Sequence, residues 1–279
     1  MAHRTKGFGE RLEEAGQERG RLCVGIDPHP YLLEKWGLGP TADGLRTFSM
    51  RCVEAFSDTA ALVKPQVAFF ERFGSQGFAV LEEVLAALRE AGCLTVADAK
   101  RGDIGSTMAG YADAWLGDSS PLRADSVTVS PYLGVGALGP VFTKAEETGR
   151  GVFVLAATSN PEARAIQSVP VGEESTIAQG VVDECAAFNV EAHKAGKPGD
   201  VGVVVGATLD NPPRLDALNG PVLLPGVGAQ GAGPEQVHGI VSAHPSLGFA
   251  NVSRAVLEQG PDVADLRKVV AQVAVEFRD

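Results

Sequence analysis

Eight short apolar segments alternate along the chain with longer segments whose apolar residues recur at helical spacing. The expected strands span residues 21–28, 61–67, 93–97, 125–129, 151–156, 201–205, 221–224 and 247–252. They are apolar on both faces, which is typical of parallel strands covered by helices. Eight such units in 279 residues predict a single-domain α/β fold, a closed (β/α)8 TIM barrel spanning residues 1–279. A doubly wound open sheet is the alternative.

The intervening segments carry helix signals. Thr41 can cap a helix whose apolar positions Leu45, Phe48, Cys52 and Phe56 recur at helical spacing. Other helices are expected at about residues 104–116, 135–147, 176–195, 214–218 and 263–277. A short helical extension, about residues 1–20, precedes the first strand, and a polar, mobile connection is expected at residues 158–174.

Composition excludes several classes of function. The net charge of -11 argues against a nucleic-acid or anionic-membrane surface, because both require a basic face. No apolar run of about 18 residues suggests a membrane span. The four cysteines lie far apart without a C-x-x-C pair, so they indicate reduced thiols in a cytoplasmic protein rather than a zinc site or a disulfide framework.

Three charged residues follow the third apolar segment at unusual spacing. Because side chains in a strand alternate, Asp98 and Lys100 should point to the same face, and Asp103 follows after a glycine turn. Carboxylates around a lysine favour its charged form, so the pattern predicts a fixed cation. The alternative is a set of solvated charges at a strand end, worth less than about 1 kcal/mol as ion pairs.

The barrel fold gives this pattern a location. Active sites of such barrels lie at the carboxyl ends of the strands. Polar residues or glycines at or just after expected strand ends are Asp27, Lys64, Asp98, Lys100, Ser159, Gly226, Gly228 and Arg254. Their convergence on one rim predicts a ligand site.

The last two strands are expected to end in an anion site. The glycines of residues 225–231 free backbone N–H groups to approach a ligand, and Arg254 follows the eighth strand. Phosphate sites recur at this position in (β/α)8 barrels. The alternative is that the glycines only turn the chain.

With these features the chain resembles the orotidine 5'-phosphate decarboxylases, and in particular their longer bacterial subgroup. The similarity covers nearly the whole chain. It is carried by Gly-Ile-Asp-Pro at residues 25–28, Val-Lys-Pro-Gln at 63–66, Asp-Ala-Lys-Arg-Gly-Asp-Ile-Gly-Ser-Thr at 98–107, Thr-Ser-Asn-Pro at 158–161, residues 225–231, and Ser-Arg at 253–254.

The resemblance implies decarboxylation of orotidine 5'-phosphate to uridine 5'-phosphate, the last step of de novo pyrimidine nucleotide synthesis, without metal or cofactor. It implies a catalytic charge network of Lys64, Asp98, Lys100 and Asp103, in which Lys100 stabilises and protonates a carbanion at C6. It implies a homodimer in which Asp103 and Thr107 complete the neighbour's site. The remaining implied contacts are Asp27 and Lys64 with the ribose, Ser159 with the pyrimidine, and Gln230 and Arg254, beside Gly226 and Gly228, with the phosphate.

Three other functions remain open at this stage. Sugar-phosphate decarboxylases of the same suprafamily use the D-x-K-x-x-D element around Mg2+, so dependence on metal would distinguish them. A Schiff-base aldolase needs a neutral lysine, which flanking carboxylates disfavour. A non-catalytic protein that binds nucleotide phosphates would keep the anion site without the full charge network.

Overall fold

The computed structural model describes residues 6–172, 175–228 and 230–278. Eight parallel strands close into a barrel in the order β1-β10-β9-β8-β5-β4-β3-β2. They are β1 (Leu22–Ile26), β2 (Leu62–Pro65), β3 (Leu94–Arg101), β4 (Ser126–Val129), β5 (Gly151–Ala157), β8 (Val201–Val205), β9 (Val222–Pro225) and β10 (Gly248–Val252). The predicted closed barrel is therefore confirmed, and the open-sheet alternative is wrong.

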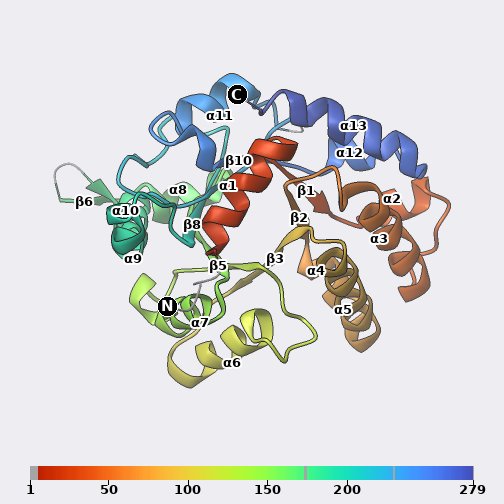
Figure 1. Ribbon diagram of the computed structural model, residues 1–279, viewed down its shortest axis with the longest axis horizontal. Helices are drawn as coiled ribbons and strands as arrows, with labels where there is room; N and C mark the ends of the chain where they lie inside the picture. The colour runs from red at the N-terminus through yellow and green to blue at the C-terminus, as the bar shows by residue number, and fades with distance from the viewer. Residues whose placement is uncertain (1–5, 173–174, 229, 279) are drawn as a thin grey trace.

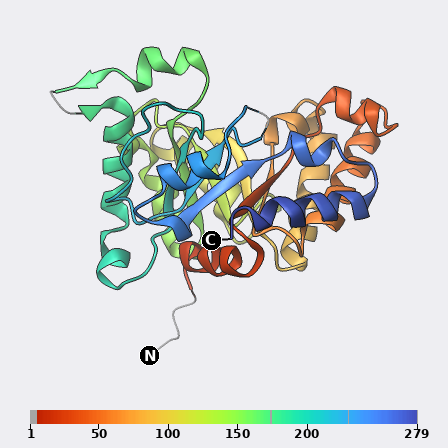
Figure 2. The same cartoon turned by 90° about the horizontal axis from the view of Figure 1, so that it is seen from above.

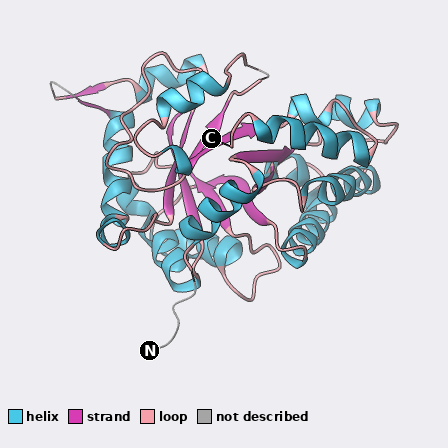
Figure 3. Ribbon diagram, turned by 45° about the horizontal axis from the view of Figure 1, so that its top comes forward, coloured by secondary structure: helices cyan, strands magenta, loops and turns pink. Residues whose placement is uncertain are grey.

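Helices surround this barrel (Figures 1 and 3). The α-helices are α1 (Phe8–Arg19), α2 (Pro30–Lys35), α3 (Ala42–Phe56), α4 (Val67–Glu71), α5 (Gly74–Glu90), α6 (Gly105–Leu116), α7 (Gly139–Thr148), α8 (Arg164–Gln167), α9 (Ile177–Phe188), α10 (Val190–Lys194), α11 (Pro234–Ile240), α12 (Arg254–Leu257) and α13 (Val263–Val275). Short 3-10 helices are η1 (Val135–Leu138), η2 (Pro161–Ala163) and η3 (Pro245–Leu247). Thr41 caps α3 as predicted, because its hydroxyl accepts a hydrogen bond from the backbone N–H of Gly44.

One helix prediction differs in detail from the structure. The helix expected at 176–195 is divided at Asn189 into α9 and α10. The side chain of Asn189 is buried, and its amide donates to the carbonyls of Val201 and Leu218. The short turn of helix expected near 214–218 is present as a single turn, in which the backbone N–H of Leu218 donates to the carbonyl of Leu215. The backbone N–H of Arg214 donates to the side chain of Gln179.

The connection at 158–174 has more structure than a simple loop. After β5 the chain forms η2 and α8 and then a hairpin of β6 (Pro170–Val171) with β7 (Ser175–Thr176). Residues 173–174 of this connection lie outside the described residues, as do residues 1–5 of the N-terminal extension.

Helix α1 closes the amino-terminal mouth of the barrel (Figure 1). Residues just before two strands hold it: Asp200 accepts a hydrogen bond from the backbone N–H of Gly9, and Asp125 forms an ion pair with Arg11. Phe8 and Leu12 of α1 are fully buried in an apolar cluster inside the barrel. The interior is thus sealed at the end opposite the carboxyl ends of the strands, and in Figure 2 α1 lies on the opposite side from the β6–β7 hairpin.

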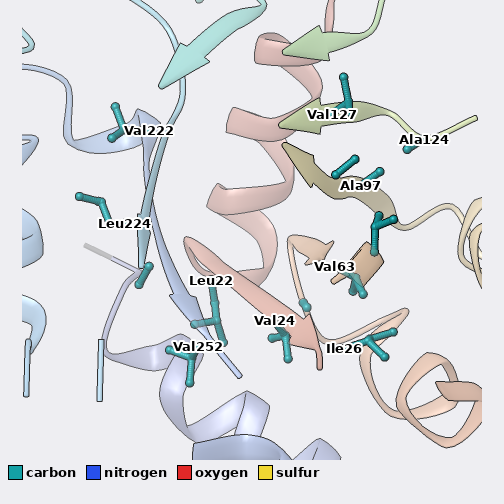
Figure 4. Close-up of a cluster of buried hydrophobic side chains, with 14 of the residues drawn as sticks. Leu22, Val24, Ile26, Val63, Ala97, Ala124, Val127, Val222, Leu224 and Val252 are labelled. Atoms are coloured by element: carbon teal, nitrogen blue, oxygen red, sulfur yellow. The ribbon is translucent and has the colours of Figure 1, made fainter. Parts of the chain in front are cut away.

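A second, larger core lies between the strands and the helices. Figure 4 shows part of it, with Leu22, Val24 and Ile26 along β1. Residues of β1 between these positions face the barrel interior instead, as Cys23 does in the inner cluster. This alternation carries Asp27 to the inner face, at the rim.

Two further observations bear on the sequence predictions. All four cysteines are unpaired and buried, and burial raises the pKa of Cys23 to about 12. Within the described part of the chain, no helix is both long and apolar enough to cross a bilayer.

Candidate active site

Charged side chains from three neighbouring strands line one cavity at the carboxyl ends of the barrel strands. Asp27 directly follows β1, Lys64 lies in β2, and Asp98 and Lys100 lie in β3. All four line the cavity, whose volume is about 270 Å3. The expectation that these residues meet at one rim is confirmed by their position.

The four charges alternate in sign along a row. The ammonium nitrogen of Lys64 lies 3.9 Å from Oδ1 of Asp27 and 2.9 Å from Oδ2 of Asp98. The ammonium nitrogen of Lys100 lies 2.6 Å from Oδ1 of Asp98. The prediction that Asp98 and Lys100 lie side by side is confirmed. The sequence pattern predicted a lysine between two carboxylates, whereas the structure places the carboxylate of Asp98 between the ammonium groups of Lys64 and Lys100.

Two members of this row are buried and one is half exposed. The side chains of Asp98 and Lys64 are 9% and 8% exposed, whereas that of Lys100 is 46% exposed. Burial by itself would raise the pKa of Asp98, but the ammonium groups of Lys64 and Lys100 outweigh it and hold this pKa well below its usual range. Burial would likewise lower the pKa of Lys64, but Asp98 and Asp27 outweigh it and raise that pKa.

Two uncharged residues complete the environment of Asp98, and the sequence analysis missed both. The side-chain amide of Gln66 donates to Oδ2 of Asp98 at 2.8 Å, and the hydroxyl of Thr128 donates to Oδ1 at 2.9 Å. Each carboxylate oxygen thus accepts two hydrogen bonds, one from an ammonium group and one from a neutral donor. Strand alternation offered a signal, since Gln66 follows Lys64 by two positions.

The segments after β9 and β10 contain the residues of the predicted anion site. Gly226 and Gly228 have left-handed backbones, with φ of +102° and +71°, which favour glycine. At Gly226 a Cβ would also come within 3.0 Å of the side-chain oxygen of Gln230. Gly226, Gln230 and Arg254 line the cavity, so this part of the predicted anion site, the anion cradle, faces the same space as the charged residues, whereas Gly228 does not line it.

The loops after β5 and β9 meet over the cavity. The hydroxyl of Ser159 donates to Oε1 of Gln230 at 2.9 Å. Ser159 itself does not line the cavity, but its neighbour Thr158 does. Gln167 of α8 accepts a hydrogen bond from the backbone N–H of Thr158, which fastens the long connection to the rim.

The floor of the cavity is apolar, and its residues were not predicted from sequence. Leu155, Val204 and Leu223 supply it from β5, β8 and β9. The amide of Asn251 lies beside them and donates to the sulfur of Cys23 at 3.2 Å. In the barrel order these strands lie between β4 on one side and β10 on the other.

Asp103 and Thr107 do not join the cavity of their own chain. Asp103 lies in the turn between β3 and α6, where its carboxylate accepts a hydrogen bond from the backbone N–H of Ile104. Thr107 is exposed in the first turn of α6. Among the described residues, no three His, Cys, Asp or Glu side chains are arranged to hold a metal ion.

Comparison with known proteins gives concordant matches. The model of the orotidine 5'-phosphate decarboxylase / HUMPS family matches residues 20–269. The chain is 62% identical over 273 residues to the orotidine 5'-phosphate decarboxylase of Corynebacterium efficiens, covering 98% of each protein. It is 60% identical over 270 residues to that of Corynebacterium glutamicum, covering 97% of each.

Solved structures share the fold. The crystal structure of a Streptomyces avermitilis protein, described as a candidate orotidine 5'-phosphate decarboxylase, matches with a TM-score of 0.93 at 50% identity, over 98% of this chain and 95% of that one. The structure of Leishmania donovani OMP decarboxylase matches with a TM-score of 0.77 at 31% identity, over 98% and 100% of the two chains. The family match spans every residue that lines the cavity.

Proposed function

The chain belongs to the orotidine 5'-phosphate decarboxylase / HUMPS family, and we propose that it converts orotidine 5'-phosphate into uridine 5'-phosphate and CO2 without a metal or cofactor. The observation that carries the proposal is the row Asp27, Lys64, Asp98 and Lys100 in one cavity with the anion cradle. This pairing suits a nucleotide whose reacting carbon lies far from its phosphate.

The substrate would span the cavity from cradle to row. Its phosphate would bind Arg254, Gln230 and the backbone N–H groups near Gly226 and Gly228. Its ribose hydroxyls would contact Asp27 and Lys64. The Oδ1 atom of Asp27 supports this assignment, because it is buried without a hydrogen-bond partner among the described groups and can accept one.

The reaction removes CO2 from C6 of the pyrimidine ring. The bond from C6 to the carboxylate carbon breaks, its electron pair stays on C6, and the resulting carbanion lies in the ring plane, where the ring cannot delocalise it. The ammonium group of Lys100 would stabilise this charge and then transfer a proton to C6. The lysine is half exposed, so solvent can restore its proton.

Asp98 would keep the ammonium of Lys100 beside C6. Its lowered pKa keeps it ionised at neutral pH, and its four hydrogen bonds fix its orientation. A second cation, Lys64, offsets the charge that Asp98 would otherwise bring close to the departing carboxylate. The row would thus place the ammonium group of Lys100 at C6, while the buried charges of Lys64 and Asp98 neutralise each other.

The phosphate would contribute at a distance from the chemistry. Binding energy at Arg254 can be used to order the loop at residues 226–233 over the substrate. The hydrogen bond between Ser159 and Gln230 supports this, because it joins that loop to the long connection after β5. Ser159 would contact the pyrimidine from there.

A homodimer would complete the site, with Asp103 and Thr107 of one chain entering the cavity of the other. Asp103 and Thr107 lie outside the cavity of their own chain. Ile104, Tyr132 and Leu133 are 61%, 79% and 55% exposed at the same rim. A second copy covering them would bury this apolar surface. The unpaired cysteines support a cytoplasmic location.

The test is the ultraviolet absorbance of purified protein mixed with orotidylate, with and without a chelator. Conversion to uridylate that resists the chelator is the expected result. Chelator-sensitive activity on a sugar phosphate would instead move the protein to the metal-dependent relatives. Tight uridylate binding without conversion would make it a non-catalytic nucleotide-binding protein.

A further inference from the structure

Thr128 occupies a position in β4 that links the two central charged residues. Its side chain is 2% exposed and lines the cavity. The hydroxyl accepts a hydrogen bond from the backbone N–H of Lys100 at 2.9 Å and donates one to Oδ1 of Asp98 at 2.9 Å. Because a hydroxyl has a single proton, these two bonds fix its direction: the proton points to the carboxylate.

The backbone of Lys100 explains why such a link is needed. Lys100 has a φ of +47°, in the left-handed region that a lysine seldom adopts. The pairing of β3 with β4 shifts register between Ala97 and Arg101, so the ladder is interrupted at Lys100. The hydroxyl of Thr128 takes the place of the backbone carbonyl that an uninterrupted ladder would supply to the N–H of Lys100.

The side chain of Lys100 lines the cavity although its backbone departs from regular strand geometry. Its ammonium approaches Oδ1 of Asp98 to 2.6 Å. Of the four side chains that donate to Asp98, Thr128 is the one that also bonds the backbone of Lys100. Its hydroxyl therefore fixes the carboxylate and the base of the lysine side chain relative to each other.

We propose that Thr128 is a positioning residue for the decarboxylation, which holds the ammonium of Lys100 at the reacting carbon through its paired hydrogen bonds to Asp98 and to the backbone of Lys100. The inference rests on the proposed function. Without the hydroxyl, the N–H of Lys100 has no replacement acceptor in the strand, and Asp98 loses one of its two bonds on the side that faces Lys100. The proton donor is then held less firmly while the phosphate end of the site is unchanged.

The decisive comparison is between Thr128→Val and Thr128→Ser. Valine keeps the shape and removes the hydroxyl, whereas serine keeps the hydroxyl. Thr128→Val is expected to lower kcat for orotidylate by about 10- to 100-fold with little change in KM, the effect of losing a hydrogen bond to a charged group. Thr128→Ser is expected to keep kcat within about 3-fold of wild type. If the valine variant does not fold, Thr128→Ala takes its place.

Ser126→Ala is the matched control on the same strand. Ser126 is also fully buried, and its hydroxyl donates to the backbone carbonyl of Thr95 at 3.0 Å, away from the charged row. This variant is expected to lose thermal stability without losing kcat. If Thr128→Val behaves in the same way, or if Thr128→Ser is as slow as Thr128→Val, the proposal is overturned.

A structural readout separates this proposal from the proposed function. The crystal structure of Thr128→Val is expected to show Lys100 with a changed φ or its ammonium displaced from Oδ1 of Asp98. A variant that keeps both the left-handed backbone and the 2.6 Å contact would refute the positioning role, whatever the substrate. A wild-type protein inactive on orotidylate would instead refute the proposed function.

Discussion

The buried ion pair of Lys64 with Asp98 makes a testable prediction about stability. In Asp98→Asn the side chain keeps its shape but loses its charge, so the buried ammonium of Lys64 is left without its nearest counter-charge. Breaking a buried ion pair by removing one partner typically costs about 3–5 kcal/mol. Asp27, 3.9 Å away, still faces the ammonium, so we expect a loss near the lower limit, about 3 kcal/mol at pH 7.

The dependence of this loss on pH follows from the pKa of each group. In the wild type the lowered pKa of Asp98 stabilises the fold above the ordinary carboxyl pKa, and that stability is lost only as pH falls through the lowered value. The raised pKa of Lys64 stabilises the fold below the ordinary lysine pKa, and that stability is lost only as pH rises through the raised value. Neither contribution changes between about pH 6 and pH 9.

In Asp98→Asn we expect the pKa of Lys64 to be lowered instead of raised. Burial lowers this pKa, and after the substitution the carboxylate of Asp98 no longer offsets that effect. The unfolded chain binds the lysine proton more strongly than the folded protein, so the variant gains stability as pH rises. Urea unfolding, followed by the fluorescence of the buried residues Trp36 and Trp115, would measure the deficit at several pH values. We expect the deficit to shrink between about pH 6 and pH 9.

Two controls sharpen this test. Adding Lys64→Met to Asp98→Asn removes the stranded charge and should restore most of the lost stability, because replacing both members of a buried pair is often neutral. Glu83→Gln breaks the exposed pair of Glu83 with Arg46 and should cost less than about 1 kcal/mol. A deficit for Asp98→Asn below about 1 kcal/mol, or one that is constant across this pH range, would refute the reasoning.

Lys100→Ala is expected to lower kcat by at least about 10,000-fold. Its urea midpoint should stay near that of the wild type, because Lys64 still neutralises Asp98. Near-normal turnover would show that Lys100 takes no part in the chemistry. Arg254→Ala should raise KM for orotidylate by about 10- to 100-fold, and an unchanged KM would exclude it from the phosphate site. Phe8→Ala should lower the free energy of unfolding by about 3–5 kcal/mol, because its fully buried ring packs edge-on against Phe153. A loss below about 1 kcal/mol in urea unfolding would show that α1 does not seal the barrel.

Periodicity predicted the barrel because the signal repeats eight times and each repeat constrains the others. It did not predict the division of the expected helix 176–195 into α9 and α10 at Asn189. The buried amide of Asn189 donates to the carbonyl of Val201 at the start of β8. Helical periodicity carries no information about such a bond between a helix and the following strand.

Strand ends predicted the charged half of the site for a similar reason. Parallel strands carry their carboxyl ends to one rim, so Asp27, Lys64 and Asp98 meet whatever the details of packing. Thr128 was missed because neutral polar residues at strand positions are common, and Gln66 was missed although its spacing from Lys64 places both on the same face. Only the hydrogen bonds to Asp98 distinguish them.

The third strand is the element where sequence pattern and structure diverge most, and the divergence is informative. Alternation predicted a strand ending at Ala97, yet β3 continues to Arg101 across a shift in register. Arg101 anchors the far side: its guanidinium pairs with Glu71 and lies over the ring of Trp115. The backbone N–H of Lys100 is bonded to Thr128, and the next residue, Arg101, is fixed by its own contacts. Together they hold Lys100 in a left-handed backbone conformation that costs free energy. A surface lysine paired only by chance would relax to an ordinary strand conformation. The strained conformation persists because the surrounding contacts enforce it. Such strain is expected at a functional site, where the position of the Lys100 ammonium group is more important for activity than a regular strand.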